Sequence, residues 1–324
     1  YNSLAANLTK DRTSLVGLAT PFEGLLGSPY FSNFVMGAQG LLAGMDYSIT
    51  LYDSLSDNFN DGKKLMRLIR QRRVDGLLVL APHENDPFLR TLSDLEMPLV
   101  VIGGRPKTKG IAWVDVDHVG GIQAVMDYLY QLGHRDFGFL AGPEYLSDAN
   151  RRENAFRNYL EKKNLITNEA WIKRGEYEHL IARSAAQKML SLSRKPTAIV
   201  AANDLMALGA LDAAHLLGMN VPEDISITGF DDSHIASETL PALTTVRQPT
   251  RKLGNEAASL LIDQFQSPQN KSPKHCVFST ELIIRESTDS PSQHRIFNEY
   301  TEFYSHSETN SLSGIHTCRV AGNY

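Results

Sequence analysis

The feature that most constrains this chain is a regular alternation of short apolar segments with longer amphipathic ones. The short segments, for example residues 75–82 (DGLLVLAP) and 134–142 (HRDFGFLAG), contain apolar runs without clean alternation. Such runs are typical of strands in a parallel sheet whose two faces are both covered by helices. The alternation starts at Ser14 and begins again near Gly133. The sequence therefore predicts an α/β fold of two doubly wound parallel sheets, with a ligand cleft between them.

Composition narrows the functional classes. Of the 324 residues, 42% are hydrophobic and 21% are charged, and the net charge of -5 argues against a dominant basic surface for nucleic acid. Cys276 and Cys318 are the only cysteines, which leaves no disulfide framework and no cysteine-rich metal site. No apolar run approaches the roughly 18 residues of a membrane span. We expect a cytoplasmic protein without a metal or cofactor, although a mature periplasmic protein would have a similar composition.

Sequence motifs give no support for catalysis. The sequence contains no G-x-G-x-x-G, no G-x-x-x-x-G-K-[ST], no H-E-x-x-H, no G-x-S-x-G and no C-x-x-C. The ten histidines are scattered along the chain. An enzymatic alternative would use Asp115, Asp231 and Arg152 as acid, base and electrophile, but no motif favours it. We therefore expect a protein that is not an enzyme.

Two polar residues, Asn203 and Asp204, stand between an apolar strand pattern and an apolar helix pattern in residues 199–218 (IVAANDLMALGALDAAHLLG). Asn and Asp are both favoured helix N-caps, and one of them is enough for that role. The other is free to face a ligand, because parallel sheets bind small molecules at the carboxyl ends of their strands.

Several segments together resemble one family. Residues 195–232 (KPTAIVAANDLMALGALDAAHLLGMNVPEDISITGFDD) and 240–263 (LPALTTVRQPTRKLGNEAASLLID) are similar to the effector-binding core of the lactose-repressor (LacI/GalR) family of bacterial transcription regulators. The similarity extends over roughly Ser14 to Ser287. The first residues, YNSLAANL, resemble the end of that family's hinge segment, and nothing in the chain resembles its helix-turn-helix headpiece.

The resemblance implies two periplasmic-binding-protein-like subdomains joined by three crossovers, which we place near Gly133, Arg247 and Val277. The expected domains are a hinge remnant at 1–13, an N-terminal effector-binding subdomain at 14–132 plus 248–276, a C-terminal effector-binding subdomain at 133–247 plus 277–287, and a disordered tail at 288–324.

The resemblance also implies which residues face the effector. Asn203 would contact ligand hydroxyls while Asp204 caps the helix, and Asp231 would accept hydrogen bonds from hydroxyls while Asp232 is a solvated turn residue. Arg152 would be the cleft arginine and Arg151 a solvated neighbour. The complete set of expected effector-binding residues is Tyr30, Phe31, Asp115, Arg152, Tyr177, Asn203, Asp231 and Gln248.

Some of these assignments carry alternatives or weaker matches. Tyr177 would lay its ring on the apolar face of a sugar, and Tyr30 and Phe31 would form the opposite wall, unless they are simple core residues. Asp115 and Gln248 match further polar contacts. In the hinge, Leu8 matches the leucine that family members wedge into the DNA minor groove, although an amphipathic residue of a disordered arm is the alternative.

The function that follows is a ligand-responsive, DNA-binding transcriptional repressor. Its partners would be a small effector, most often a sugar or sugar phosphate and alternatively a nucleobase, operator DNA in the full-length protein, and a second copy in a homodimer. The dimer interface is expected on helical faces that include KKLMRLIR and ALGALDAAHLLG. The alternative function is a periplasmic sugar-binding protein of a transporter, which the hinge match and LPALTTVRQP disfavour.

Overall fold

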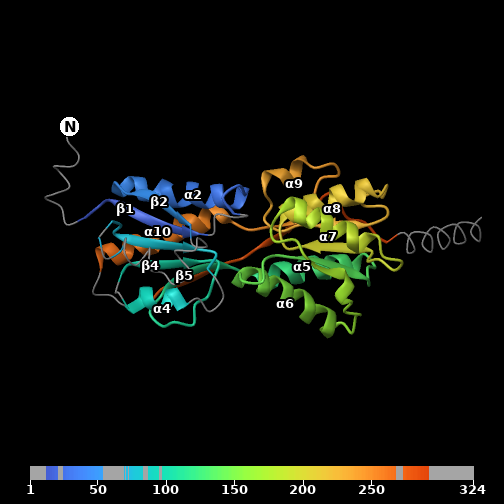
Figure 1. Ribbon diagram of the computed structural model, residues 1–324, viewed down its shortest axis with the longest axis horizontal. Helices are drawn as coiled ribbons and strands as arrows, with labels where there is room; N and C mark the ends of the chain where they lie inside the picture. Colours follow the sequence, from blue (N-terminus) through green and yellow to red (C-terminus); the bar gives the residue numbers. More distant parts are fainter. Residues whose placement is uncertain are drawn as a thin grey trace, which may run out of the picture.

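The computed structural model describes residues 12–20, 25–53, 69, 71, 73–82, 87–94, 97–267 and 273–291. These residues form two lobes that follow one another along the longest axis of the molecule (Figure 1). The first lobe contains a six-stranded sheet in the order β11-β5-β4-β3-β1-β2, and the second contains a four-stranded sheet in the order β7-β6-β8-β9. All neighbouring strands in both sheets are parallel, which confirms the predicted fold class.

The strands and helices of each lobe come from separate parts of the chain. The first lobe has strands β1 (Leu15–Thr20), β2 (Ser48–Asp53), β3 (Gly76–Leu80), β4 (Leu99–Ile102), β5 (Ala112–Val116) and β11 (His275–Phe278), with helices α2 (Pro29–Leu42), α4 (Pro87–Asp94) and α10 (Thr250–Gln266). The second has strands β6 (Phe137–Ala141), β7 (Ile172–Arg174), β8 (Ala198–Ala201) and β9 (Ser226–Thr228), with helices α5 (His118–Gln131), α6 (Ser147–Lys162), α7 (His179–Leu190), α8 (Asp204–Leu216) and α9 (His234–Glu238). An antiparallel pair, β10 (Thr245–Arg247) and β12 (Glu281–Ile283), lies beside β9.

The sheet of the first lobe is buried on both faces. In β3, Leu78 and Leu80 belong to a cluster that includes residues of α2 and α10, whereas Leu77 and Val79 belong to a cluster that includes residues of α4. Since successive side chains of a strand point to opposite faces, this division explains why β3 is apolar at every position. The helices that the structure describes include none with the length and apolar composition of a membrane-spanning segment.

The first crossover between the lobes lies at Asp117, so its expected position near Gly133 is wrong. Asp117 caps α5 by accepting from the N–H of Gly120 at 2.9 Å. The buried face of α5, for example Ile122 and Met126, belongs to the core of the second lobe, and Figure 1 shows α5 beside α6 there. The periodicity of a helix shows which of its faces is buried, but not which sheet receives that face.

The other two crossovers run beside the first. The chain leaves β10 through Gln248 and Pro249 and enters α10, which packs on α2 in the first lobe. It returns between β11 and β12. Val277 still pairs with Asp115 of β5, so this crossover begins only after Phe278. Three adjacent connections therefore join the lobes.

The chain remains packed beyond Ser287, where the disordered tail was expected to begin. Thr288 is buried, and its hydroxyl lies 3.1 Å from the Tyr128 hydroxyl and 2.9 Å from that of Thr244. The carbonyl of Asp289 accepts from Nε2 of His134 at 2.8 Å. Because these contacts use backbone groups and hydroxyls, the packed segment has no apolar pattern in its sequence. Its polar composition therefore led to the wrong prediction of disorder for these residues.

His134 should make folding sensitive to acid. Burial, with a smaller contribution from the charge of Arg135, lowers the pKa of His134 to about 4. The unfolded chain therefore binds a proton on this histidine at about pH 6.5, whereas the folded chain binds it only at about pH 4. This contribution to the free energy of unfolding is complete above about pH 6.5 and is lost as the pH falls toward about 4. Chemical denaturation between pH 7 and pH 4 should show wild type losing about 3 kcal/mol more than His134→Gln. Equal losses in the two proteins would contradict this assignment.

Candidate functional site

A cavity lies where the two lobes meet. The carboxyl ends of both parallel sheets open toward it, as in other open α/β sheets that bind ligands. The first lobe contributes Tyr30, Ala81, Gly103 and Asp115, and the crossover contributes Gln248. Among the lining residues of the second lobe are His118, Tyr145, Asp148, Arg152, Glu176, Tyr177, Asn203 and Asp231.

Arg152, on α6, is buried, and it is the one arginine among the described residues that line this cavity. Its Nε donates to Nδ1 of His118 at 3.1 Å, and its Nη1 donates to the carbonyl of Ala202. Its guanidinium carbon lies 3.9 Å from the ring centroid of Phe230, a cation–π distance. The guanidinium is thus fixed in position without a hydrogen bond to a carboxylate.

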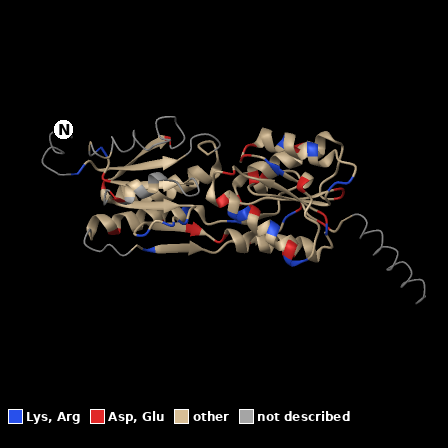
Figure 2. Ribbon diagram, turned by 60° about the horizontal axis from the view of Figure 1, so that its bottom comes forward, with Lys and Arg blue, Asp and Glu red and all other residues tan. Residues whose placement is uncertain are grey.

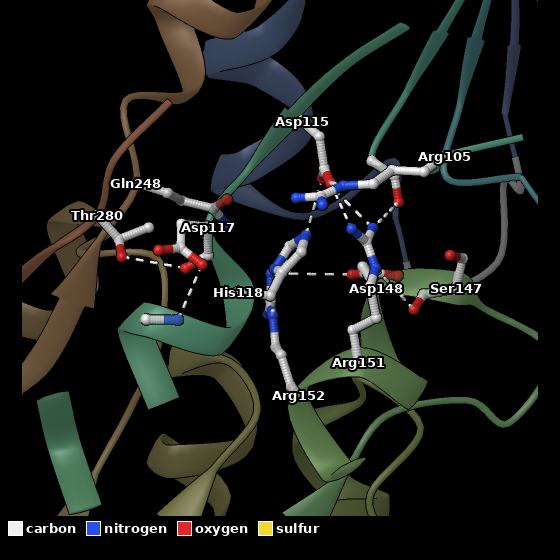
Figure 3. A network of polar contacts seen from close by, with 12 residues as sticks. Arg105, Asp115, Asp117, His118, Ser147, Asp148, Arg151, Arg152, Gln248 and Thr280 are labelled. Carbon is white, nitrogen blue, oxygen red and sulfur yellow. Dashed lines mark hydrogen bonds and ion pairs between the residues drawn. The ribbon is translucent and has the colours of Figure 1, made fainter. Parts of the chain in front are cut away.

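His118 connects Arg152 to the first lobe through hydrogen bonds on both ring nitrogens (Figure 3). Its Nδ1 accepts from Arg152, so its Nε2 must carry the proton and donate to Oδ1 of Asp115, at 3.1 Å. Burial, together with the charges of Arg152 and Arg151 and against the opposing effect of Asp115, lowers the pKa of His118. A neutral imidazole is the form that this pair of contacts requires.

Asp115 is a completely buried carboxylate held by both lobes. Arg105, which follows β4, donates to its Oδ2 at 2.7 Å, and Arg151 of α6 also pairs with it. Burial alone would raise the pKa of Asp115, but hydrogen bonds and charges from His118 and Arg151 bring that pKa well below its ordinary range. Arg151 also donates to the carbonyl of Gly103 at 3.1 Å, so it connects the lobes and is not the solvated residue expected from the sequence.

Asp231 follows β9 and faces the cavity. Its Oδ1 accepts from Nε2 of Gln248 at 2.5 Å and lies 3.9 Å from Nη1 of Arg152. Burial raises the pKa of Asp231, since nearby Arg152 does not compensate for it fully and the charge of Asp204 adds to the rise. Asp232 is not the solvated turn residue expected, because it pairs with Arg247 at 2.6 Å and with Arg285 at 2.5 Å.

The roles of Asn203 and Asp204 differ from the expectation. Asn203 is the N-cap of α8, because its Oδ1 accepts from the N–H of Met206 at 2.8 Å, and it also lines the cavity. Asp204 caps nothing. Its carboxylate accepts from the N–H and hydroxyl of Ser233 and from the hydroxyl of Thr245, and so holds the loop after β9. The cap had been assigned to the wrong residue of the pair.

The turn that presents Tyr177 is strained. Glu176 and Tyr177 have φ values of 56° and 59°, in the left-handed region that non-glycine residues rarely adopt. The Tyr177 ring lies against Gly142, where a Cβ would come within 2.6 Å of the ring. Its hydroxyl donates to Oδ2 of Asp148 at 2.9 Å. This turn and Gly142 together place the ring on the cavity wall.

Tyr30 lines the cavity, and its burial raises the pKa of its hydroxyl far above the ordinary value. Phe31 does not line it. That ring packs in the core of the first lobe with residues of α2 and α10, so the core alternative holds for Phe31. Leu8 lies outside the described residues.

Seven of the eight expected effector residues therefore line one cavity, namely Tyr30, Asp115, Arg152, Tyr177, Asn203, Asp231 and Gln248. Sequence reasoning missed His118, Asp148 and Glu176. The position of each directly after a strand, or in the first turn of a helix that faces a strand end, was the available signal. Among the described residues there is no group of side chains suited to hold a metal ion.

Comparison with known proteins supports this architecture. Residues 126–288 match a family described as "Periplasmic binding protein-like domain". The HTH-type transcriptional repressor PurR of Edwardsiella ictaluri is 33% identical over 270 residues, which are 82% of this chain and 77% of that protein. Two solved structures are also similar. A transcriptional regulator CelR–cellobiose complex has a TM-score of 0.78 and 30% identity, covering 85% of each chain. The lac repressor dimer bound to operator and the anti-inducer ONPF has a TM-score of 0.77 and 25% identity, covering 89% of this chain and 99% of the other.

The two parallel sheets, three adjacent crossovers and interlobe cavity define a periplasmic-binding-protein-like effector domain. Within that class, the chain belongs to the LacI family of transcription regulators, as the identity and coverage of these relatives show.

Removing Arg151 should loosen the contact between the lobes. An Arg151→Ala variant leaves the buried Asp115 carboxylate with fewer partners, so we expect a loss of roughly 3 kcal/mol in unfolding free energy and a larger radius of gyration by small-angle X-ray scattering. Arg105→Ala is the matched control, since Arg105 binds the same carboxylate from within the first lobe and its side chain is 45% exposed. Identical radii for Arg151→Ala and wild type would contradict the interlobe role.

Proposed function

We propose that this chain is the effector-sensing part of a LacI-family repressor whose interlobe cavity binds a small sugar. The observation that carries the proposal is the cavity's combination of fixed polar groups and aromatic rings. Arg152, Asp231 and Asn203 offer charged and amide hydrogen-bonding groups, and Tyr177 and Tyr30 offer rings for the apolar face of a pyranose. The cellobiose complex of the similar regulator CelR supports this ligand class.

A sugar phosphate is disfavoured as the effector. In the part of the lining that the structure describes there are four carboxyl side chains, Asp115, Asp148, Glu176 and Asp231, and a single arginine. A phosphate dianion would approach Asp148 and Glu176, which are not hydrogen-bonded to a cation, so repulsion would oppose its entry. We therefore propose an effector without a phosphate.

The proposed assembly is a homodimer that presents DNA-binding heads to an operator, as the lac repressor dimer binds its operator. Exposed apolar side chains on α7 and at the end of α8, including Leu180, Ile181, Leu216 and Leu217, favour the helical face predicted around ALGALDAAHLLG. The other predicted element, KKLMRLIR, lies almost entirely outside the described residues. A transporter-associated sugar-binding protein remains the alternative, and a monomer at micromolar concentration in sedimentation would favour it.

Binding should depend on Arg152 and Asp231. A thermal-shift screen of mono- and disaccharides should identify a ligand, because a site occupied at 100 times Kd adds about 2.7 kcal/mol of stability. By isothermal titration, Arg152→Ala or Asp231→Ala should then weaken binding of that ligand about ten- to hundredfold, the effect of one hydrogen bond to a charged group.

Arg157→Ala is the matched control, since Arg157 is on the same helix but pairs with Glu153 and Glu169, which do not line the cavity. The proposal is wrong if no saccharide stabilises the protein, or if Arg152→Ala binds the ligand as tightly as Arg157→Ala does.

A further inference from the structure

Among the described residues that line the cavity, acidic side chains outnumber basic ones. Of its four carboxylates, Asp115 is neutralised from outside the cavity by Arg105 and Arg151. Asp148, Glu176 and Asp231 remain, and among the described lining residues Arg152 is the one cationic side chain. Three carboxyl groups against one guanidinium leave an excess of two negative charges when all are ionised, and of one when the Asp231 carboxyl, whose pKa burial raises, holds its proton.

Arg152 satisfies neither of its nearest carboxylates by a hydrogen bond. Its Nη2 lies 3.8 Å from Oδ2 of Asp148, and its Nη1 lies 3.9 Å from Oδ1 of Asp231. Its short contacts go instead to neutral groups, the ring of His118 and the carbonyl of Ala202. Glu176 forms no ion pair with any described residue. The cavity therefore has acceptor capacity for a further cation.

Asp148 is the carboxylate best placed to receive that cation. Its Oδ2 accepts from the Tyr177 hydroxyl, whereas its Oδ1 is buried and has no hydrogen-bond partner in the part of the chain that the structure describes. A buried acceptor without a partner costs free energy that a donating ligand would recover. The rings of Tyr177 and Tyr145 also line the cavity, and the face of an aromatic ring attracts a cation.

Two further observations bear on the missing cation. Burial raises the pKa of Asp231, and the charges of Asp204 and Asp148 contribute to that rise. No group of three or more metal-ligating side chains occurs among the described residues, so a divalent metal ion is disfavoured as the missing cation. An ammonium group needs only acceptors within hydrogen-bonding distance.

We propose that the effector carries a protonated amine on its polyhydroxylated ring, as an amino sugar does, and that Asp148 receives this amine. The inference rests on the proposed function, because it specifies the class of sugar that the same cavity selects. The amine donates to the carboxylate of Asp148, and the ring hydroxyls meet Arg152, Asn203 and Asp231.

The test compares matched sets of ligands by isothermal titration on the full chain. Each set contains a neutral pyranose, its amino sugar, the N-acetyl derivative and the 6-phosphate, for example glucose, glucosamine, N-acetylglucosamine and glucose 6-phosphate, and likewise for galactose and mannose. In at least one set the amino sugar should bind about ten- to hundredfold more tightly than the neutral pyranose and the N-acetyl derivative. The 6-phosphate should bind most weakly.

Asp148→Asn should abolish this preference for the amine, so that the amino sugar binds the variant no more tightly than the neutral pyranose does. The substitution keeps an oxygen that can accept from the Tyr177 hydroxyl, so the strained turn retains its contact. Glu161→Gln, an exposed position on the same helix, removes the same charge away from the cavity and should change nothing.

The outcomes separate the two proposals. If neutral pyranoses bind as tightly as amino sugars, or if Asp148→Asn keeps the preference for the amine, the amine is wrong and the sugar effector stands. Tightest binding of a 6-phosphate overturns the charge argument and the exclusion of sugar phosphates. If no pyranose in any set binds, both the amine and the sugar effector are wrong.

Discussion

The burial of one carboxylate, Asp115, is the constraint on which the cavity depends. A carboxylate without solvent is stable only when cations and hydrogen-bond donors surround it. Here the donors come from both lobes: Arg105 from the first lobe, Arg151 from α6, and His118 from the start of α5. The same His118 accepts from Arg152, the arginine of the cavity. Contact between the lobes and orientation of the effector-binding arginine are therefore consequences of one buried network (Figure 3).

The rest of the cavity shows how packing energy maintains unfavourable local features. Glu176 and Tyr177 are two successive residues in the left-handed region, and the half-buried Asp231 adopts a φ of 130°. Packing of the hydrophobic cores stabilises these conformations, because the strands that end at the cavity, such as β6 and β8, are completely buried. Charged side chains are spread over both lobes (Figure 2), so the concentration of carboxylates around a single arginine is a property of the cavity rather than of the whole surface.

The sequence alone predicts the repeating part of this structure well. Apolar runs identify the strands, and the rule that ligands bind at carboxyl ends of parallel strands, together with the family resemblance, brings Arg152, Asp231, Tyr177 and Asn203 to one place. Prediction from the sequence fails where a structural feature depends on a contact between residues that are distant in sequence. Nothing local shows that α5 packs on the second sheet, or that Arg151 reaches Asp115. Asn203 and Asp204 are equally good caps by residue type, and only the hydroxyls of Ser233 and Thr245 decide between them.

The protonation state of His118 tests the central network most directly. In this arrangement His118 is neutral, with its proton on Nε2 and its Nδ1 accepting from Arg152, and its pKa is lowered by burial and by the nearby arginines. A pH titration of the ¹⁵N-histidine-labelled protein by NMR, with His118 assigned by substitution, reports both features. We predict the neutral Nε2–H tautomer persisting as the pH falls through about 6.5, the ordinary histidine pKa. A His118 that becomes positively charged at or above that pH, or that carries its proton on Nδ1, would contradict the network.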